Sequence, residues 1–130
     1  MIRQVLNVNN KWKVVIYYNV DYNLFRIIET ELYVEGVKRK TIKRIYDIMS
    51  KEKAKAVTIS NNRTSIVLFN KHKTKYDYIN SIAHEAEHIK QAMLYYYNVK
   101  DLGEPPAYTI GYLVSEMIKV LNKYNNEINI

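Results

Sequence analysis

The chain contains 130 residues, 48% of them hydrophobic, which is enough to bury the core of one domain spanning residues 1–130. It contains no cysteine, which excludes disulfide scaffolds and thiolate-ligated zinc and leaves His, Asp and Glu as metal ligands. Residues 1–11 lack the apolar segment of a signal peptide, and no run approaches the roughly 20 apolar residues that span a bilayer. We therefore expect a cytoplasmic protein without a membrane segment.

The charge is basic, with 20 Lys and Arg against 13 Asp and Glu and a formal net charge of +7. Such a charge attracts nucleic acid or acidic partners through salt-sensitive interactions. The lysines are scattered from Lys38 to Lys75, however, with no compact basic block interleaved with aromatic residues. We therefore interpret them as a solvated surface and do not expect a nucleic-acid partner.

The first half of the chain predicts one strand and two helices. Residues 11–20 form a β-branched and aromatic run without breakers, which indicates a strand. Asp21 is a suitable N-cap for a helix over 22–34, and Gly36 ends that helix. A second helix is expected over 38–51. Both helices have ordinary core-packing patterns, and neither is assigned any chemistry.

Two further strands are expected over 56–60 and 65–69, joined by an Asn-rich hairpin turn at 61–64. Together with the first strand they predict a small antiparallel or mixed sheet of about three strands. His72 lies in the polar connection that follows, where we expect an exposed loop residue without a partner.

The C-terminal half predicts two long helices. Residues 76–97 contain no Gly or Pro, and their apolar residues follow a helical stripe: Ile79, Ile82, Ala83, Ala86, Ile89, Met93 and Tyr97. The last helix is expected over 104–124, where Gly111 suggests a close approach to the preceding helix. The fold class is therefore α+β, with about three strands and four helices.

The run His84-Glu85-Ala86-Glu87-His88 has the form H-E-x-x-H and falls on the third helix. Residues four apart share one helix face, with Cβ atoms about 5–6 Å apart, so His84 and His88 can ligate one zinc ion. Glu85 lies about 100° around the helix, placed as a general base for a zinc-bound water. The alternative interpretation is two surface histidines that happen to be four residues apart.

Catalytic zinc usually takes three protein ligands, and the remaining candidates are the carboxylates of Glu104 and Glu116 on the last helix. Tight antiparallel packing of the two helices would bring Glu116 to the level of His88. A looser turn would bring Glu104 there instead, so spacing leaves both open.

Residues 58–116 resemble a family of small zincin-type peptidases encoded by bacteriophages and other mobile elements. In that family a pattern S-N…R-x-S-x-V is followed by H-E-x-x-H and then by E-x-x-A-Y. The matching residues are Ser60, Asn61, Arg63 and Ser65, then His84, Glu85 and His88, then Glu104, Ala107 and Tyr108. The resemblance implies a zincin-like, minimal gluzincin-like fold, with Glu104 as the third ligand and Ala107 and Gly111 as a helix-packing face.

Tyr108 follows Glu104 by four residues and is expected to share its helix face. It is therefore a candidate to hydrogen-bond the metal ligand or a transition-state oxyanion, and packing explains it equally well.

These features predict a zinc-dependent peptidase of minimal size, a hydrolase that acts on a peptide or protein substrate with narrow specificity. An open strand edge would pair with the substrate. The resemblance further implies a phage or host protein partner and a location in the bacterial cytoplasm or the virion. The alternative is a non-enzymatic phage or mobile-element assembly protein that retains the zincin fold. The presence of Glu85 distinguishes the peptidase from the assembly protein, because a structural metal site does not need this carboxylate.

Overall fold

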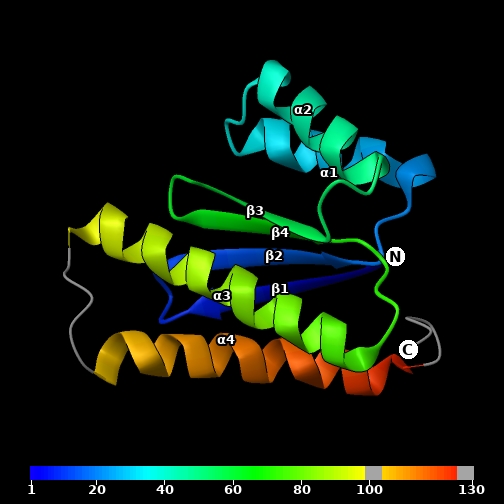
Figure 1. Cartoon of the computed structure of the whole chain (residues 1–130). Helices are drawn as coiled ribbons and strands as arrows, with labels where there is room; N and C mark the ends of the chain where they lie inside the picture. The colour runs from blue at the N-terminus through cyan, green and yellow to red at the C-terminus, as the bar shows by residue number, and fades with distance from the viewer. Residues whose placement is uncertain (99–103, 126–130) are drawn as a thin grey trace.

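The computed structural model describes residues 1–98 and 104–125, except for the side chains of 104–107. Pairs of strands are each followed by a pair of α-helices along the chain (Figure 1). Their bounds are β1 Ile2–Val8, β2 Trp12–Tyr18, η1 Tyr22–Leu24, α1 Phe25–Val34, α2 Arg39–Ser50, β3 Ala56–Asn61, β4 Thr64–Phe69, α3 Lys75–Tyr97 and α4 Glu104–Lys123.

The sheet has four strands in the order β1-β2-β4-β3, so the prediction of three strands is wrong. β2 pairs antiparallel with β1 and parallel with β4, and β3 pairs antiparallel with β4. The missed strand is β1, whose asparagine content hid a half-buried alternation in which Leu6 and Val8 face the core. The α+β class and the mixed sheet are confirmed.

Helices cover both faces of the sheet, α1 and α2 on one side and α3 and α4 on the other (Figure 1). The central strands are buried throughout, so their side chains alternate between two cores. On β2, Val14 and Ile16 pack toward α3 and α4, whereas Val15 and Tyr17 pack toward α1 and α2. The outer layer of α1 and α2 is therefore separated from α3 by a full sheet.

The turns follow the predicted chemistry. Asn62 and Arg63 have φ of 54° and 63° between the paired residues Asn61 and Thr64, as in a two-residue type I′ hairpin. Gly36 ends the first helix with φ of 87°, which is strained for any residue with a Cβ. The H-E-x-x-H run lies on the third α-helix, as expected. Among the described helices, none combines the length and the apolarity needed to cross a membrane.

Candidate metal centre

The helix α3 presents the H-E-x-x-H run between a buried and an exposed face. It begins at Thr74, whose Oγ1 accepts a hydrogen bond from the amide of Asp77 at 3.1 Å, and continues for 23 residues. Ala83 and Tyr97 of the predicted stripe are exposed. The residues that do face the sheet recur at helical spacing: Tyr78, Ser81, Ile82, Glu85, Ala86, Ile89 and Lys90.

His84 and His88 are both exposed and point toward each other. Their Nε2 atoms lie 3.1 Å apart, and their ring planes are inclined by 82°. Two nitrogens that each lie about 2.0–2.1 Å from a tetrahedral zinc ion are about 3.3 Å apart. The pair therefore has nearly the separation that a shared zinc ion requires, although two neutral imidazoles can also hydrogen-bond at this distance.

Glu85 is buried against the sheet, with 4% of its surface exposed. Its Oε1 accepts a hydrogen bond from Thr58 Oγ1 at 2.8 Å. Thr58 is opposite Val67 in the β3–β4 register, which places it on the face of the sheet that α3 covers. One potential ligand atom from each of His84, Glu85 and His88 lies within 4.8 Å of the others. The carboxylate is thus fixed beside the imidazoles by a strand residue.

His84 and Glu85 of this group line a cavity at the edge of the sheet. This cavity has a volume of about 400 Å³ and is lined by Lys55, Ala56, Ser81, His84 and Glu85, among others. β3 is the edge strand on this side, so its outer backbone groups face away from β4. The imidazole of His84, the carboxylate of Glu85 and the edge strand β3 therefore meet at this cavity.

The histidines lie on the flank of α3 that is turned away from α4. Lys75 is nine residues before His84, about 180° around the helix, and its Nζ donates to Asn122 Oδ1 of α4 at 2.5 Å. Tyr97 is nine residues after His88, and its hydroxyl donates to the Lys11 carbonyl at the β1–β2 turn, at 3.1 Å. The described part of α4 therefore packs on the opposite flank.

The register of α3 and α4 bears on the two predicted third ligands. With Lys75 beside Asn122 in an antiparallel pair, Glu116 lies level with Ser81, about 10 Å along the axis from His88. The carboxylate of Glu116 binds Lys119 Nζ at 2.8 Å, and it does not join the histidine group. The side chain of Glu104 lies outside the described residues, so its role as a ligand stays a prediction.

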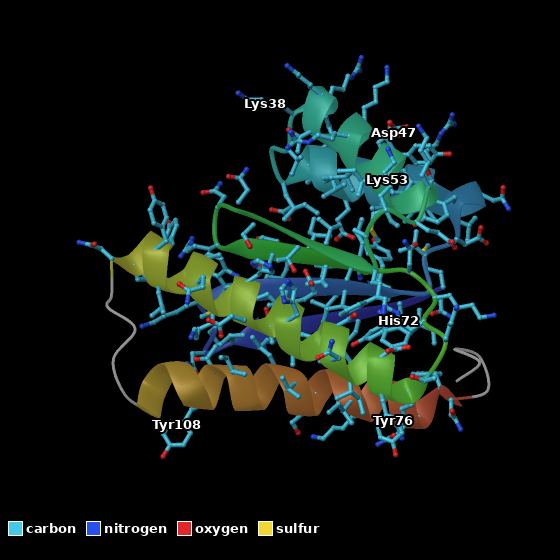
Figure 2. The ribbon with its side chains drawn as sticks, in the orientation of Figure 1. Lys38, Asp47, Lys53, His72, Tyr76 and Tyr108 are labelled. Atoms are coloured by element: carbon cyan, nitrogen blue, oxygen red, sulfur yellow. The ribbon has the colours of Figure 1, made fainter. Side chains whose placement is uncertain are left out.

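Two other predicted residues of α4 lie away from the group. Tyr108 is 69% exposed and lines a different cavity, of about 410 Å³, with Asn7 and Asn9 at the β1 edge. Figure 2 shows it on the side of α4 that is turned away from α3. Gly111 is exposed, and a Cβ added there would meet no atom within 4 Å, so the expectation that Gly111 marks a close approach to α3 is wrong.

His72 is buried, which corrects the expectation of an exposed loop residue. Its Nδ1 lies 2.7 Å from the Asn70 carbonyl oxygen and its Nε2 lies 2.7 Å from Ser81 Oγ. Because a carbonyl only accepts, Nδ1 carries the proton and Ser81 donates to Nε2. The ring also stacks on Tyr78, with centroids 4.3 Å apart. Burial lowers the pKa of His72, and the contact with the Asn70 carbonyl opposes that shift only in part.

The contact of Thr58 with Glu85 was not predicted from the sequence, although the pattern of β3 indicates it. Within β3, Val57 and Ile59 pack toward α1 and α2, whereas the small residue Ala56 and the polar residues Thr58 and Ser60 lie on the other face. A polar stripe on a strand that packs against a helix indicates a hydrogen-bond partner on that helix.

Comparisons with known proteins assign no family to the chain. No protein-family model, no curated protein and no solved structure matches it. The site is therefore interpreted from its own geometry.

Proposed function

We propose that the chain is a zinc-dependent peptidase of minimal size, in which His84 and His88 hold the metal and Glu85 is the general base. The observation that carries the proposal is the 3.1 Å separation of the two Nε2 atoms beside a buried carboxylate. Two exposed histidines without a metal role would not require a glutamate to be buried next to them. Burying a carboxylate costs free energy unless its hydrogen bonds compensate, so a buried glutamate at this position favours a chemical role.

The donor set fits a zinc ion, since neutral imidazole nitrogens are among its preferred ligands. A zinc ion supplies Lewis-acid chemistry, polarising a peptide carbonyl and lowering the pKa of a water molecule toward about 7. Glu85 accepts the proton of the attacking water and returns it to the leaving amine. Thr58 holds one carboxylate oxygen, which keeps Glu85 in position for both transfers.

The third ligand in this proposal is Glu104, at the first residue of α4. The resemblance to the E-x-x-A-Y pattern supports it. The competing carboxylate, Glu116, is already paired with Lys119, and its own backbone carbonyl accepts a hydrogen bond from Gln4 of β1. We therefore expect Glu104→Ala to weaken zinc binding and Glu116→Ala to leave it unchanged.

The proposed substrate is an extended peptide that pairs with the outer edge of β3. An edge strand can bind a peptide through main-chain hydrogen bonds, and the cavity beside His84 then receives the scissile bond. The cavity volume of about 400 Å³ accommodates only a short stretch of substrate, which supports narrow specificity.

The test combines zinc analysis with peptide hydrolysis for wild type and Glu85→Gln. We expect both proteins to bind one equivalent of zinc, measured by mass spectrometry of the metal. Hydrolysis of a mixed peptide library by the Gln variant should fall by at least about 10²-fold, the scale of a lost general base.

The matched control is Glu87→Gln. It removes the same charge from the same helix, two residues away, where the carboxylate binds Lys90 Nζ at 3.0 Å. This variant should keep wild-type activity. Zinc bound in wild type without hydrolysis of any library member would contradict the peptidase and favour the assembly role.

A further inference from the structure

The net positive charge of the protein arises from one part of the chain. Residues 38–75 contain twelve Lys and Arg against two Asp and Glu, a net charge of +10, which exceeds the +7 of the whole chain. The remaining residues together carry a net negative charge. Four of the twelve cations of this segment lie on α2, which covers the face of the sheet opposite to the histidines (Figure 1).

The helix α2 separates its cations from its apolar residues. Ile42, Ile45 and Met49 are buried toward the sheet. Figure 2 shows long side chains with nitrogen tips, Lys38 among them, extending from this layer away from the sheet. In the part of the chain that the structure describes, five exposed cations here form no ion pair: Lys38, Arg39, Lys40, Lys43 and Arg44.

A cavity of about 420 Å³ lies between α1 and α2, within this basic layer. Tyr46 at its wall is 41% exposed, and its ring is held edge-on against Phe25, with centroids 4.9 Å apart. The lining combines four cations and two aromatic rings with one carboxylate, Glu29: Arg26, Arg39, Lys40, Lys43, Phe25 and Tyr46. Arg39, Lys40, Lys43 and Tyr46 lie within eight residues of one another on α2, and the fold adds Arg26 and Phe25 from α1 to the same cavity.

We propose that this cavity binds single-stranded nucleic acid, with phosphates on Arg39, Lys40 and Lys43 and one base stacked on Tyr46. Cationic grooves with aromatic platforms bind single strands without sequence preference, since every base has a face that can stack. A duplex does not offer such a face, because its bases are already stacked on one another.

The arrangement of α1 argues against a membrane surface as the partner. Arg26 faces the cavity, whereas the exposed apolar residue Ile27 lies on the other flank of α1, next to the exposed Leu24 of η1. A helix that lies in a membrane interface places its apolar side chains beneath its cations, facing the lipid. Here the apolar side chains of Phe25 and Ile42 are buried at the base of the cavity between the cations and do not form an exposed face for lipid.

The test measures fluorescence anisotropy of a labelled 20-nucleotide oligothymidine in 50 and 200 mM NaCl. For three to four phosphate contacts, the logarithm of the association constant should fall against the logarithm of salt concentration with a slope of about −2 to −3. Lys40→Gln combined with Lys43→Gln should weaken binding at least about tenfold and reduce that slope by about 1.4. Tyr46→Ala should cost about tenfold, and Tyr46→Phe should bind like wild type.

The matched control is Lys11→Gln combined with Lys123→Gln, which gives the same net charge through exposed residues far from α2. It should bind within twofold of wild type, and thermal unfolding should show that every variant is folded. Equal weakening by the control pair would overturn the proposal. So would tighter binding of a duplex of the same length, failure to bind the oligonucleotide in 50 mM NaCl, or binding only to phosphatidylserine vesicles.

Discussion

His72 and the His84–His88 pair lie in the same layer of the molecule, but their imidazole nitrogens meet opposite surroundings. Both nitrogens of His72 are hydrogen-bonded to protein atoms at 2.7 Å, and its ring is buried and stacked on Tyr78. The paired rings are exposed, and their Nε2 atoms face each other.

The difference shows that the surroundings of a histidine, more than its presence, decide what it can do. A ring with both nitrogens occupied cannot ligate a metal without breaking the hydrogen bonds of the folded chain, so His72 stabilises the connection between β4 and α3. The exposed pair can bind an ion by giving up only the contact between its two Nε2 atoms. The comparison therefore predicts that metal binding and stability depend on different histidines.

The largest expected effect is on metal affinity in His84→Ala. Loss of a direct ligand should weaken zinc binding by more than the roughly 10–100-fold that loss of an outer hydrogen-bond partner costs. The free energy of unfolding of the metal-free protein should change by less than about 0.5 kcal/mol, because the side chain is exposed. Zinc titration with a competing chelator and urea unfolding measure the two quantities.

His72→Gln should give the opposite result, with zinc affinity retained and the free energy of unfolding lowered by about 1–3 kcal/mol, since buried partners lose their hydrogen bonds. If this variant instead loses zinc while remaining stable, the contrast between the two environments is wrong.

The same residue gives the wild type a pH dependence. Because the pKa of His72 is lower in the folded chain than its ordinary value of 6.5, the unfolded chain binds a proton first on acidification. The free energy of unfolding should therefore fall as the pH decreases below about 6.5, and His72→Gln should remove this part of the dependence. Urea unfolding of the metal-free proteins at pH 7.5, 6.5 and 5.5 provides the measurement.

A smaller effect is expected for Thr58→Val, which removes the hydrogen bond to Glu85 while keeping the shape of the side chain. We expect kcat to fall about tenfold while zinc affinity stays near wild type, because the carboxylate loses its position and the imidazoles do not. Ser60→Ala is the control, since Ser60 lies on the same strand and hydrogen-bonds Ser65 instead. An equal loss of kcat in both variants would point to a general disturbance of β3.

The smallest expected effect is a gain in stability for Arg63→Gly. Arg63 has φ of 63° in the β3–β4 turn, a conformation that glycine adopts without strain. The free energy of unfolding should rise by about 0.5–1 kcal/mol in urea unfolding. Unchanged peptide hydrolysis would assign Arg63 to the turn alone, whereas a raised KM would show that it also positions substrate.

The local features of the fold were predictable from the chain. Strand and helix bounds, the turn at Asn62 and the glycine after the first helix follow from periodicity and turn chemistry, which act over a few residues. β1 was not predicted because its alternation is interrupted by a polar residue on the inner face, Gln4, and an apolar residue on the outer face, Val5, and because its burial depends on packing against α4. The hydrogen bond of the Thr58 hydroxyl and the burial of His72 were not predicted for a similar reason, since their hydrogen-bond partners lie 27 and 9 residues away.

The sequence by itself determined that two imidazoles and a carboxylate would share one turn of a helix, because spacing of four residues fixes that proximity wherever the helix lies. Tertiary structure decided which way this turn faces, toward the open edge of β3 and away from the described part of α4. It also decided that the cations from Lys38 to Arg44 lie on the layer opposite the histidines. Contacts between distant segments set these outcomes, and they depend on how helices pack on a sheet.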